Sequence, residues 1–336
     1  MSVRKESTST KSKHINSENS ADALPEGRAS DLCKNKRMGK IIFPVCVLAA
    51  GCMWGLMGLL VRSLGAVGIA SMEICFIRSI VTLISLFLII ILFQRSALRI
   101  KLMDIWCFIG TGAFSVTFFN FCYFKTMTLT SLSVAAVLLY TAPAFVMLMS
   151  AVLFQEKLSL QKIAALVIAF LGCAFVSGIV GGAGALSAKG ILYGLGAGFG
   201  YALYSIFGRY ALQKGYDSLT ISFYTFLCSS ICTLFLADRG IVADAFAGNS
   251  TLICKTILLV LIVTLFPYLF YTKGLSGVEN GTASVLASVE PVVATLVGVM
   301  VYKETLNVWN VVGVGMVLFS IVLINVNLNR KPADMN

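Results

Sequence analysis

Residues 281–304 read GTASVLASVEPVVATLVGVMVYKE, an apolar run with Glu290 and Pro291 at its centre. As a helix rising 1.5 Å per residue, this run is long enough to cross ~30 Å of hydrocarbon. A charged side chain costs roughly 2.5–3.5 kcal/mol at mid-membrane on insertion scales, and proline removes a backbone hydrogen bond. A helix that carries both is predicted to face a protein interior or a cavity.

Similar apolar runs follow one another along most of the chain. They lie near 41–61, 70–93, 103–124, 129–154, 159–180, 187–208, 217–237, 251–272, 280–302 and 307–327. Apolar residues make up 58% of the chain and charged residues 12%, against roughly a quarter in soluble domains, and the mean hydropathy is +0.90. These values predict an all-α integral membrane protein with ten transmembrane helices.

The chain repeats itself at a nearly constant offset. Identical residues lie 148 positions apart at 123/271, 125/273, 135/283, 143/291, 156/304 and 158/306, and Gly51, Trp54 and Arg62 match Gly198, Tyr201 and Arg209 at an offset of 147. Two five-helix repeats are therefore predicted, over 40–180 and 187–328. Because five is odd, the second repeat enters the membrane from the opposite side, which is a common construction of transporters.

The basic residues predict the orientation of the chain. Residues 1–39 are polar, without apolar periodicity, and are expected to form a disordered cytoplasmic tail; residues 329–336 form a second, short one. The tails and the loops on their side hold 19 lysines and arginines, against 6 on the other side. Both termini are thus predicted to be cytoplasmic in a multi-pass protein of the cell membrane. This asymmetry accounts for the net charge of +11 without a nucleic-acid partner.

Several kinds of site are excluded by the residues that are present. The only histidine, His14, lies in the polar tail, and the cysteines of the spans form no CxxC pair and are expected to be small buried hydrophobes. We therefore expect no metal, no cofactor and no catalytic residues. Gly194, Gly196, Gly198 and Gly200 lack the GxGxxG order and instead have the GxxxG spacing of closely packed membrane helices.

The stretch 281–291, the following Tyr302-Lys303-Glu304 and the glycines 313 and 315 resemble the second half of EamA-type transporters of the drug/metabolite transporter superfamily. The first half resembles them more loosely, through Trp54-Gly55, Arg78, residues 140–143 and Glu156-Lys157. The resemblance implies ten helices in two repeats, cytoplasmic termini and, often, export of amino acids or related metabolites. One departure is that Ala142 stands where the second repeat has Glu290.

Arg78 and Glu290 are the leading candidates for substrate binding. Each lies about eight to ten residues into its span, and so near the middle of the membrane. The Arg78 guanidinium is suited to a carboxylate or phosphate, and Glu290 to an ammonium group or a proton. The alternative is a structural pair between Arg78 and either Glu290 or Glu73. Glu73 lies nearer the outer interface and is expected to be a structural charge.

Prolines and polar aromatic residues complete the predicted site. Pro143 and Pro291 occupy equivalent mid-span positions and are expected to interrupt their helices beside a cavity, as a hinge or gate, or to form static kinks. Trp54, Tyr140 and Asn120 are expected to border that cavity and bind substrate, although each of them is of a type that also serves in packing.

These features together predict a secondary transporter. It would move a small metabolite, an amino acid or a related zwitterion or anion, by alternating access, and export is the expected direction. The alternatives are a membrane enzyme acting on a lipid-like substrate, a passive channel and a receptor; the aspartates form no DxxD cluster of the kind such an enzyme needs. The expected partners are the small-molecule substrate and the lipid bilayer, and a homodimer is compatible with the sequence.

Overall fold

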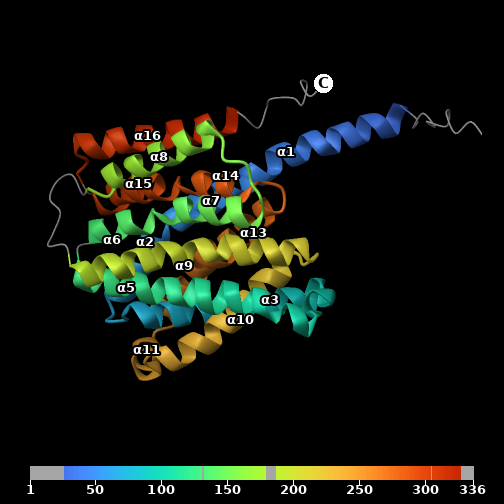
Figure 1. Ribbon diagram of the computed structural model, residues 1–336. Coiled ribbons are helices and arrows are strands. Elements are labelled where there is room, and N and C mark those ends of the chain that lie inside the picture. The colour runs from blue at the N-terminus through green and yellow to red at the C-terminus, as the bar shows by residue number, and fades with distance from the viewer. Residues whose placement is uncertain (1–25, 131, 179–186, 304, 327–336) are drawn as a thin grey trace, which may run out of the picture. The chain divides into compact units, whose positions relative to one another are not determined.

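The computed structural model describes residues 26–130, 132–178, 187–303 and 305–326, and all regular structure in these residues is helical (Figure 1). Nine helical stretches within them are long and apolar enough to cross a membrane. A shorter apolar helix, Leu160–Val176, lies where the fifth of the ten spans is predicted. Its 17 residues extend about 25 Å at 1.5 Å per residue, the lower limit for a span. The predicted all-helical membrane fold is confirmed.

The first repeat contains eleven described helical segments, nine of which form its five crossings. They are α1 (Glu26–Gly55), α2 (Met57–Gly65), α3 (Ser71–Phe93), α4 (Ile105–Ile109), the π-helical η3 (Gly110–Thr117), α5 (Phe118–Leu129), α6 (Leu132–Leu139), α7 (Ala142–Leu153) and α8 (Leu160–Val176), with the short 3-10 turns η1 (Arg95–Leu98) and η2 (Leu102–Asp104) before α4. The first, third and fourth crossings are each divided into consecutive segments, whereas the second and fifth are single helices.

The second repeat follows the same plan with fewer interruptions. Its segments are α9 (Ala188–Gln213), α10 (Ser218–Leu236), α11 (Arg239–Phe246), α12 (Ser250–Val260), the π-helical η5 (Leu261–Leu265), α13 (Phe266–Leu275), α14 (Asn280–Ala287), α15 (Glu290–Tyr302) and α16 (Val308–Val326). The two π-helical segments, η3 and η5, occupy equivalent places in the third and eighth crossings. Such segments interrupt the regular helical hydrogen bonding and are frequent at functional sites.

The structure departs from the sequence expectation at the N-terminal tail. Residues 26–39, expected to be disordered, form the first part of α1, while residues 1–25 and 327–336 lie outside the described residues. Lengthening an existing helix adds about one hydrogen bond per residue without a new nucleus, so a polar segment joined to a span can continue it. Helix α11, in the loop between the seventh and eighth crossings, was also not expected.

Glycines allow each repeat to pack against the proline-containing helix of the other. A Cβ at Gly51 of α1 would lie 2.9 Å from the carbonyl oxygen of Ala287, and one at Gly198 of α9 would lie 3.0 Å from that of Leu138. Gly51 and Gly198 are equivalent in the repeat, and so are the ends of α14 and α6 that they touch. The contact therefore occurs twice, once in each direction, and places the first helix of each repeat beside the fourth of the other.

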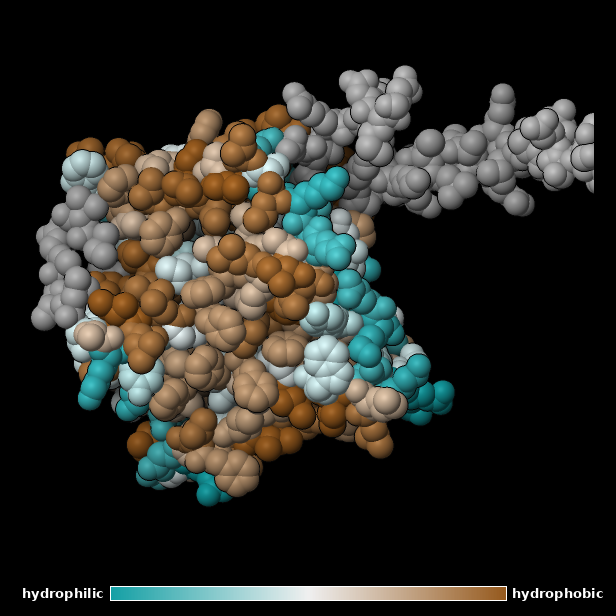
Figure 2. Space-filling model, viewed as in Figure 1, coloured by the Kyte–Doolittle hydropathy of each residue, from teal (hydrophilic) through white to brown (hydrophobic). Residues whose placement is uncertain are grey.

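The outer surface carries the apolar side chains expected beside lipid. Helices α8 and α16 lie side by side along one edge of the bundle (Figure 1), where Gly172 and Gly313 bring their backbones together. Figure 2 shows a broad apolar area across one face, with hydrophilic residues gathered near its margins. Phe235 and Val152, for example, are 81% and 80% exposed. Such exposure is costly in water but not in a bilayer.

Candidate functional site

Two helix breaks, one in each repeat, form the centre of the candidate site. The first separates α6 from α7 at residues 140–141, and the second separates α14 from α15 at residues 288–289. Pro143 and Pro291 each lie in the first turn of the helix that follows. Proline is tolerated there because the first turn has no intrahelical acceptor for its missing N–H. Each helix is thus interrupted two or three residues before its proline, and the role of these breaks as hinges stays a prediction.

The two breaks border a single cavity of about 20 Å³. It is lined by Leu139, Tyr140, Ala142 and Pro143 from the first break, by Ser284, Ala287, Ser288 and Glu290 from the second, and by Tyr201 of α9. A cavity needs roughly 10–15 Å³ to hold one water molecule, so this conformation has room for about one. The cavity is therefore too small for a solute of the size of an amino acid in this conformation.

Glu290 is the acidic residue among those that line this cavity. It is the first residue of α15 and is partly exposed. Among the residues that the structure describes, none gives its carboxylate a hydrogen bond, and Arg78 is the charged group whose field acts on it. An acidic side chain deep in a membrane protein without a bound partner is a strong indication of a ligand or proton site.

A second small cavity, of about 10 Å³, has mostly aromatic walls. Trp54, Ser115, Phe119, Tyr201, Tyr204, Ser205, Tyr268 and Tyr271 line it, so Tyr201 borders both cavities. The ring centroid of Trp54 lies 5.3 Å from that of Tyr271, 5.5 Å from that of Tyr268 and 6.1 Å from that of Tyr201. Aromatic faces attract organic cations, and this cluster adjoins the cavity of Glu290.

Two tyrosine hydroxyls of the aromatic cluster are held by hydroxyls of neighbouring helices. The Tyr204 hydroxyl lies 2.6 Å from Thr272 Oγ1, and that of Tyr271 lies 2.8 Å from Ser205 Oγ. These bonds fix the ring orientations between α9 and α13. Sequence reasoning did not select Tyr204, Tyr268 or Tyr271; for Tyr271 alone a signal was present, its equivalence to Tyr123 in the repeat.

Arg78 lies outside both cavities and takes a different partner from those expected. Its Nε donates to Thr264 Oγ1 of η5 at 3.0 Å. In the described residues Arg78 forms no ion pair with Glu290 or with Glu73. The structural pairing considered for Arg78 is therefore absent from this conformation.

Glu73 has a structural partner near the end of its helix. It is 7% exposed, and its Oε1 accepts the backbone N–H of Asp238 at 3.0 Å. The Asp238 side chain in turn accepts from the N–H of Gly240, in the first turn of α11, at 2.9 Å. Glu73 thus holds the loop that starts α11, a contact of the kind expected for a structural charge.

The remaining predicted residues fall in different places. Trp54 lines the aromatic cavity and Tyr140 the cavity of Glu290, so both border the centre as expected. Asn120 lines neither, and its Nδ2 donates to the carbonyl oxygen of Val116 at 2.6 Å. Val116 belongs to the π-helical segment, where the hydrogen-bond pattern changes, so the Asn120 amide satisfies a backbone group beside that change.

A seam of buried hydroxyls beside the site was not anticipated. Ser79 of α3 and Ser229 of α10 lie 2.9 Å apart, and Thr111 of η3 lies 2.6 Å from Thr225 of α10, measured between their side-chain oxygens. Thr117 also donates to Ser229 at 3.2 Å. Interhelical hydrogen bonds of this kind join membrane helices. Single serines and threonines in apolar spans give no pattern from which such a seam can be predicted.

Comparison with known proteins agrees with this architecture. Residues 42–178 and 188–326 each match the EamA-like transporter family. An uncharacterized transporter of Archaeoglobus fulgidus is 29% identical over 265 residues, 79% of this chain and 90% of the relative. The uncharacterized transporter YxxF of Bacillus subtilis is 26% identical over 234 residues, 68% of this chain and 72% of the relative.

A solved structure, described only as the crystal structure of a protein, has the same fold. Its TM-score is 0.72 at 16% identity, and the match covers 87% of this chain and 99% of the other. The curated relatives are described as transporters, and the family match coincides with the two repeats found in the sequence and in the helix order. The chain is a multi-pass membrane protein and belongs to the EamA-like transporter family.

Proposed function

We propose that this protein is a secondary carrier that exports an amino acid, or a related zwitterion or anion, across the cytoplasmic membrane. The observation that carries the proposal is the placement of Glu290. Its carboxylate lines a cavity that both helix breaks enclose, and no described residue gives it a hydrogen bond. A purely structural carboxylate at this depth would be expected to have protein partners.

Glu290 binds the ammonium group of the substrate or, in its absence, a proton. Trp54 and Tyr140 border the same centre, and their rings provide surfaces for an ammonium group and for an apolar side chain. Of the nitrogens of Arg78, only Nε has a hydrogen-bond partner among the described residues. The two terminal nitrogens remain for the two oxygens of a carboxylate once the site opens.

Transport proceeds by alternating access. The helices interrupted before Pro143 and Pro291 belong to repeats of opposite orientation, and both border the cavity. Rocking of one repeat against the other, with the breaks as hinges, opens the same cavity to each side in turn. The predicted cytoplasmic termini place the loops 155–162, 209–216 and 273–279 on the cytoplasmic side.

The test is flux in liposomes that contain the purified protein. A panel of labelled amino acids is offered, and at least one is expected to enter with saturation and to be accelerated by unlabelled substrate on the opposite side. Glu290→Gln is expected to lower this flux roughly 10- to 100-fold, since hydrogen bonds to charged groups contribute about 1.5–3 kcal/mol. Asp244→Asn, an exposed residue of α11, is the matched control and is expected to retain the flux.

Two results would contradict the proposal. Flux that rises linearly with concentration and shows no exchange would indicate a channel instead of a carrier. Unchanged saturable flux in the Glu290→Gln variant would remove Glu290 from the site, although the family membership of the chain would stand.

A further inference from the structure

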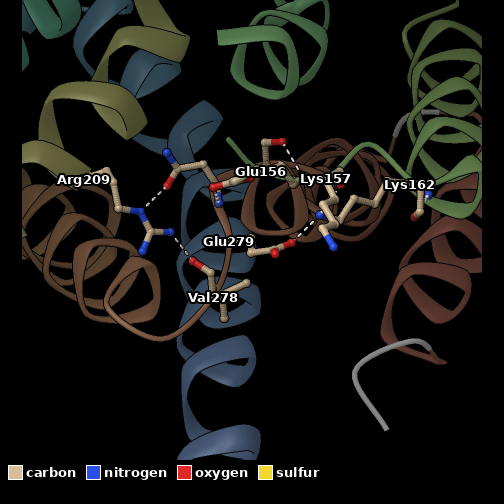
Figure 3. Close-up of polar contacts among 10 residues, drawn as sticks. Glu156, Lys157, Lys162, Arg209, Val278 and Glu279 are labelled. Atoms are coloured by element: carbon tan, nitrogen blue, oxygen red, sulfur yellow. Dashed lines mark hydrogen bonds and ion pairs between the residues drawn. The ribbon is translucent and has the colours of Figure 1, made fainter. Parts of the chain in front are cut away.

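A cluster of polar residues joins the two repeats at the start of α14 (Figure 3). In the first repeat, Glu156 lies in the loop between α7 and α8. Its Oε1 accepts the backbone N–H of Asn280 at 2.9 Å, and its Oε2 accepts that of Gly281 at 3.2 Å. These N–H groups begin α14 of the second repeat, where a carboxylate is favoured by the exposed donors and the helix dipole. One side chain thus holds a helix of the opposite repeat.

Arg209 holds the same helix start from the other side. Its Nε donates to Asn280 Oδ1 at 2.9 Å, and its Nη2 donates to the carbonyl oxygen of Val278. Arg209 lies near the end of α9, and Asn280 is fully buried. The residues before α14 are therefore fixed between α9 and the loop that carries Glu156.

An ion pair adds a second link between the repeats. Lys162, in the first turn of α8, pairs with Glu279 immediately before α14, and it also donates to the carbonyl oxygen of Lys157 at 3.0 Å. Figure 3 shows Arg209 on one side of the cluster and Lys162 on the other, with Glu156 and Glu279 between them. The side chain of Lys162 is 14% exposed and that of Glu279 is 53% exposed, so this pair lies at the rim.

The backbone before Glu156 is held in an uncommon conformation. Gln155 has φ 55°, in the left-handed region, which costs roughly 1–2 kcal/mol for a residue with a Cβ. Gln155 lies just after the end of α7, in the loop from which the Glu156 side chain contacts α14. The equivalent residue of the second repeat, Lys303, has φ 57°. A strained turn that recurs in both repeats is expected where surrounding contacts require it.

We propose that Glu156, Lys162, Arg209, Glu279 and Asn280 form a gate, here called the α14 gate, on the side predicted to be cytoplasmic. Helix α14 connects this gate to the centre: it begins at Asn280, and its last turn, with Ser284 and Ala287, lines the cavity of Glu290. The contacts of Glu156 and Lys162 cross from one repeat to the other. Separation of the repeats on this side must therefore break them, and their presence here keeps that side closed.

This inference rests on the proposed function, because only a carrier that opens on alternate sides needs such a gate. Its test nevertheless does not depend on a transported substrate. Ser284→Cys places a thiol in the wall of the cavity, in a background in which the remaining cysteines are replaced. A membrane-impermeant maleimide is applied from the predicted cytoplasmic side, and the rate of labelling measures how often that side opens.

Glu156→Ala removes the acceptor of two backbone N–H groups and is expected to raise the labelling rate on the order of tenfold. Lys157→Ala is the matched control in the same loop, because only its backbone oxygen takes part in the contacts above. Lys162→Glu is expected to raise the rate less, since its partner lies at the rim, and the double variant Lys162→Glu with Glu279→Lys is expected to return it toward the original value.

Unchanged labelling in both Glu156→Ala and Lys162→Glu, with the elution profile and melting temperature preserved, would overturn the gate. If Glu156→Ala does not fold, the test rests on the Lys162 and Glu279 variants, because this pair lies at the rim and its double variant keeps both charges. Increased labelling without flux of any offered amino acid would support the gate while contradicting the proposed substrate class. Labelling increased equally from both sides would indicate general loosening and would contradict the gate.

Discussion

The two proline-interrupted helices, 132–153 and 280–302, have the same backbone and different chemistry. Each breaks two or three residues before its proline, restarts with the proline in the first turn, and is followed by a residue of left-handed conformation. At the restart, however, one has Ala142 and the other Glu290, and both line one cavity. The two repeats thus contribute the same backbone arrangement to the site. They differ chemically at one equivalent position, where the first has Ala142 and the second has Glu290.

The largest effect is expected when the carboxylate is moved between the two halves. The double variant Glu290→Ala with Ala142→Glu keeps the charge and the cavity but places the carboxylate in the first repeat. Arg78, which acts on Glu290, has Thr225 as its equivalent in the second repeat at the offset of 147. The moved carboxylate therefore has no equivalent cation, and flux in liposomes is expected to be lost as completely as in Glu290→Ala alone. Recovered flux would mean that the inequality of the halves has no role.

A substitution that disturbs packing at the first helix break should lower stability more than one elsewhere in the bundle. In Gly198→Ala the new Cβ would lie 2.4 Å from Thr141 Oγ1 and 3.0 Å from the carbonyl oxygen of Leu138, so the first break must shift. We expect a loss of about 1–3 kcal/mol in the free energy of unfolding, measured in detergent with a denaturant series. Gly58→Ala, where nothing lies within 4 Å, is the control and should lose none. Equal losses would argue against a specific contact.

Replacement of either proline should have a smaller effect. Because Pro143 and Pro291 lie in first turns, alanine can be accommodated, and the cost is expected to stay below about 1 kcal/mol. If the breaks serve as hinges, each alanine variant slows flux by a few-fold with little change in the substrate concentration at half-maximal rate. A change confined to that concentration would instead indicate a role in binding.

The smallest effect is expected at the left-handed residue after the first of these helices. Gln155→Gly removes the Cβ that disfavours φ 55° and should raise the free energy of unfolding by about 1 kcal/mol or less. The melting temperature of the purified protein measures this gain. A lower melting temperature would mean that the Gln155 side chain contributes more than its backbone costs.

Sequence reasoning was most successful where a feature depends on local pattern or on the repeat. The positions of the spans, the two five-helix repeats and the interruptions before Pro143 and Pro291 follow from hydropathy, offset and the chemistry of proline. Partners across the bundle could not be obtained in this way. The bond from Arg78 to Thr264 and the bonds from Glu156 to the start of α14 join residues 186 and 124 or 125 positions apart, and they depend on how the helices are rotated. The helix at 26–39 was not predicted, because the polar composition of this segment was considered without the apolar span that follows it.

Glu156 binds α14 through backbone N–H groups, not through side chains. Every residue except proline offers such a donor. A substitution at position 281 can therefore leave the Glu156 contact in place, so long as it does not introduce proline, whereas the Asn280 side chain is also held by Arg209. The residue types at 280 and 281 therefore do not reveal the contact with Glu156, and this connection between the repeats has to be traced in three dimensions.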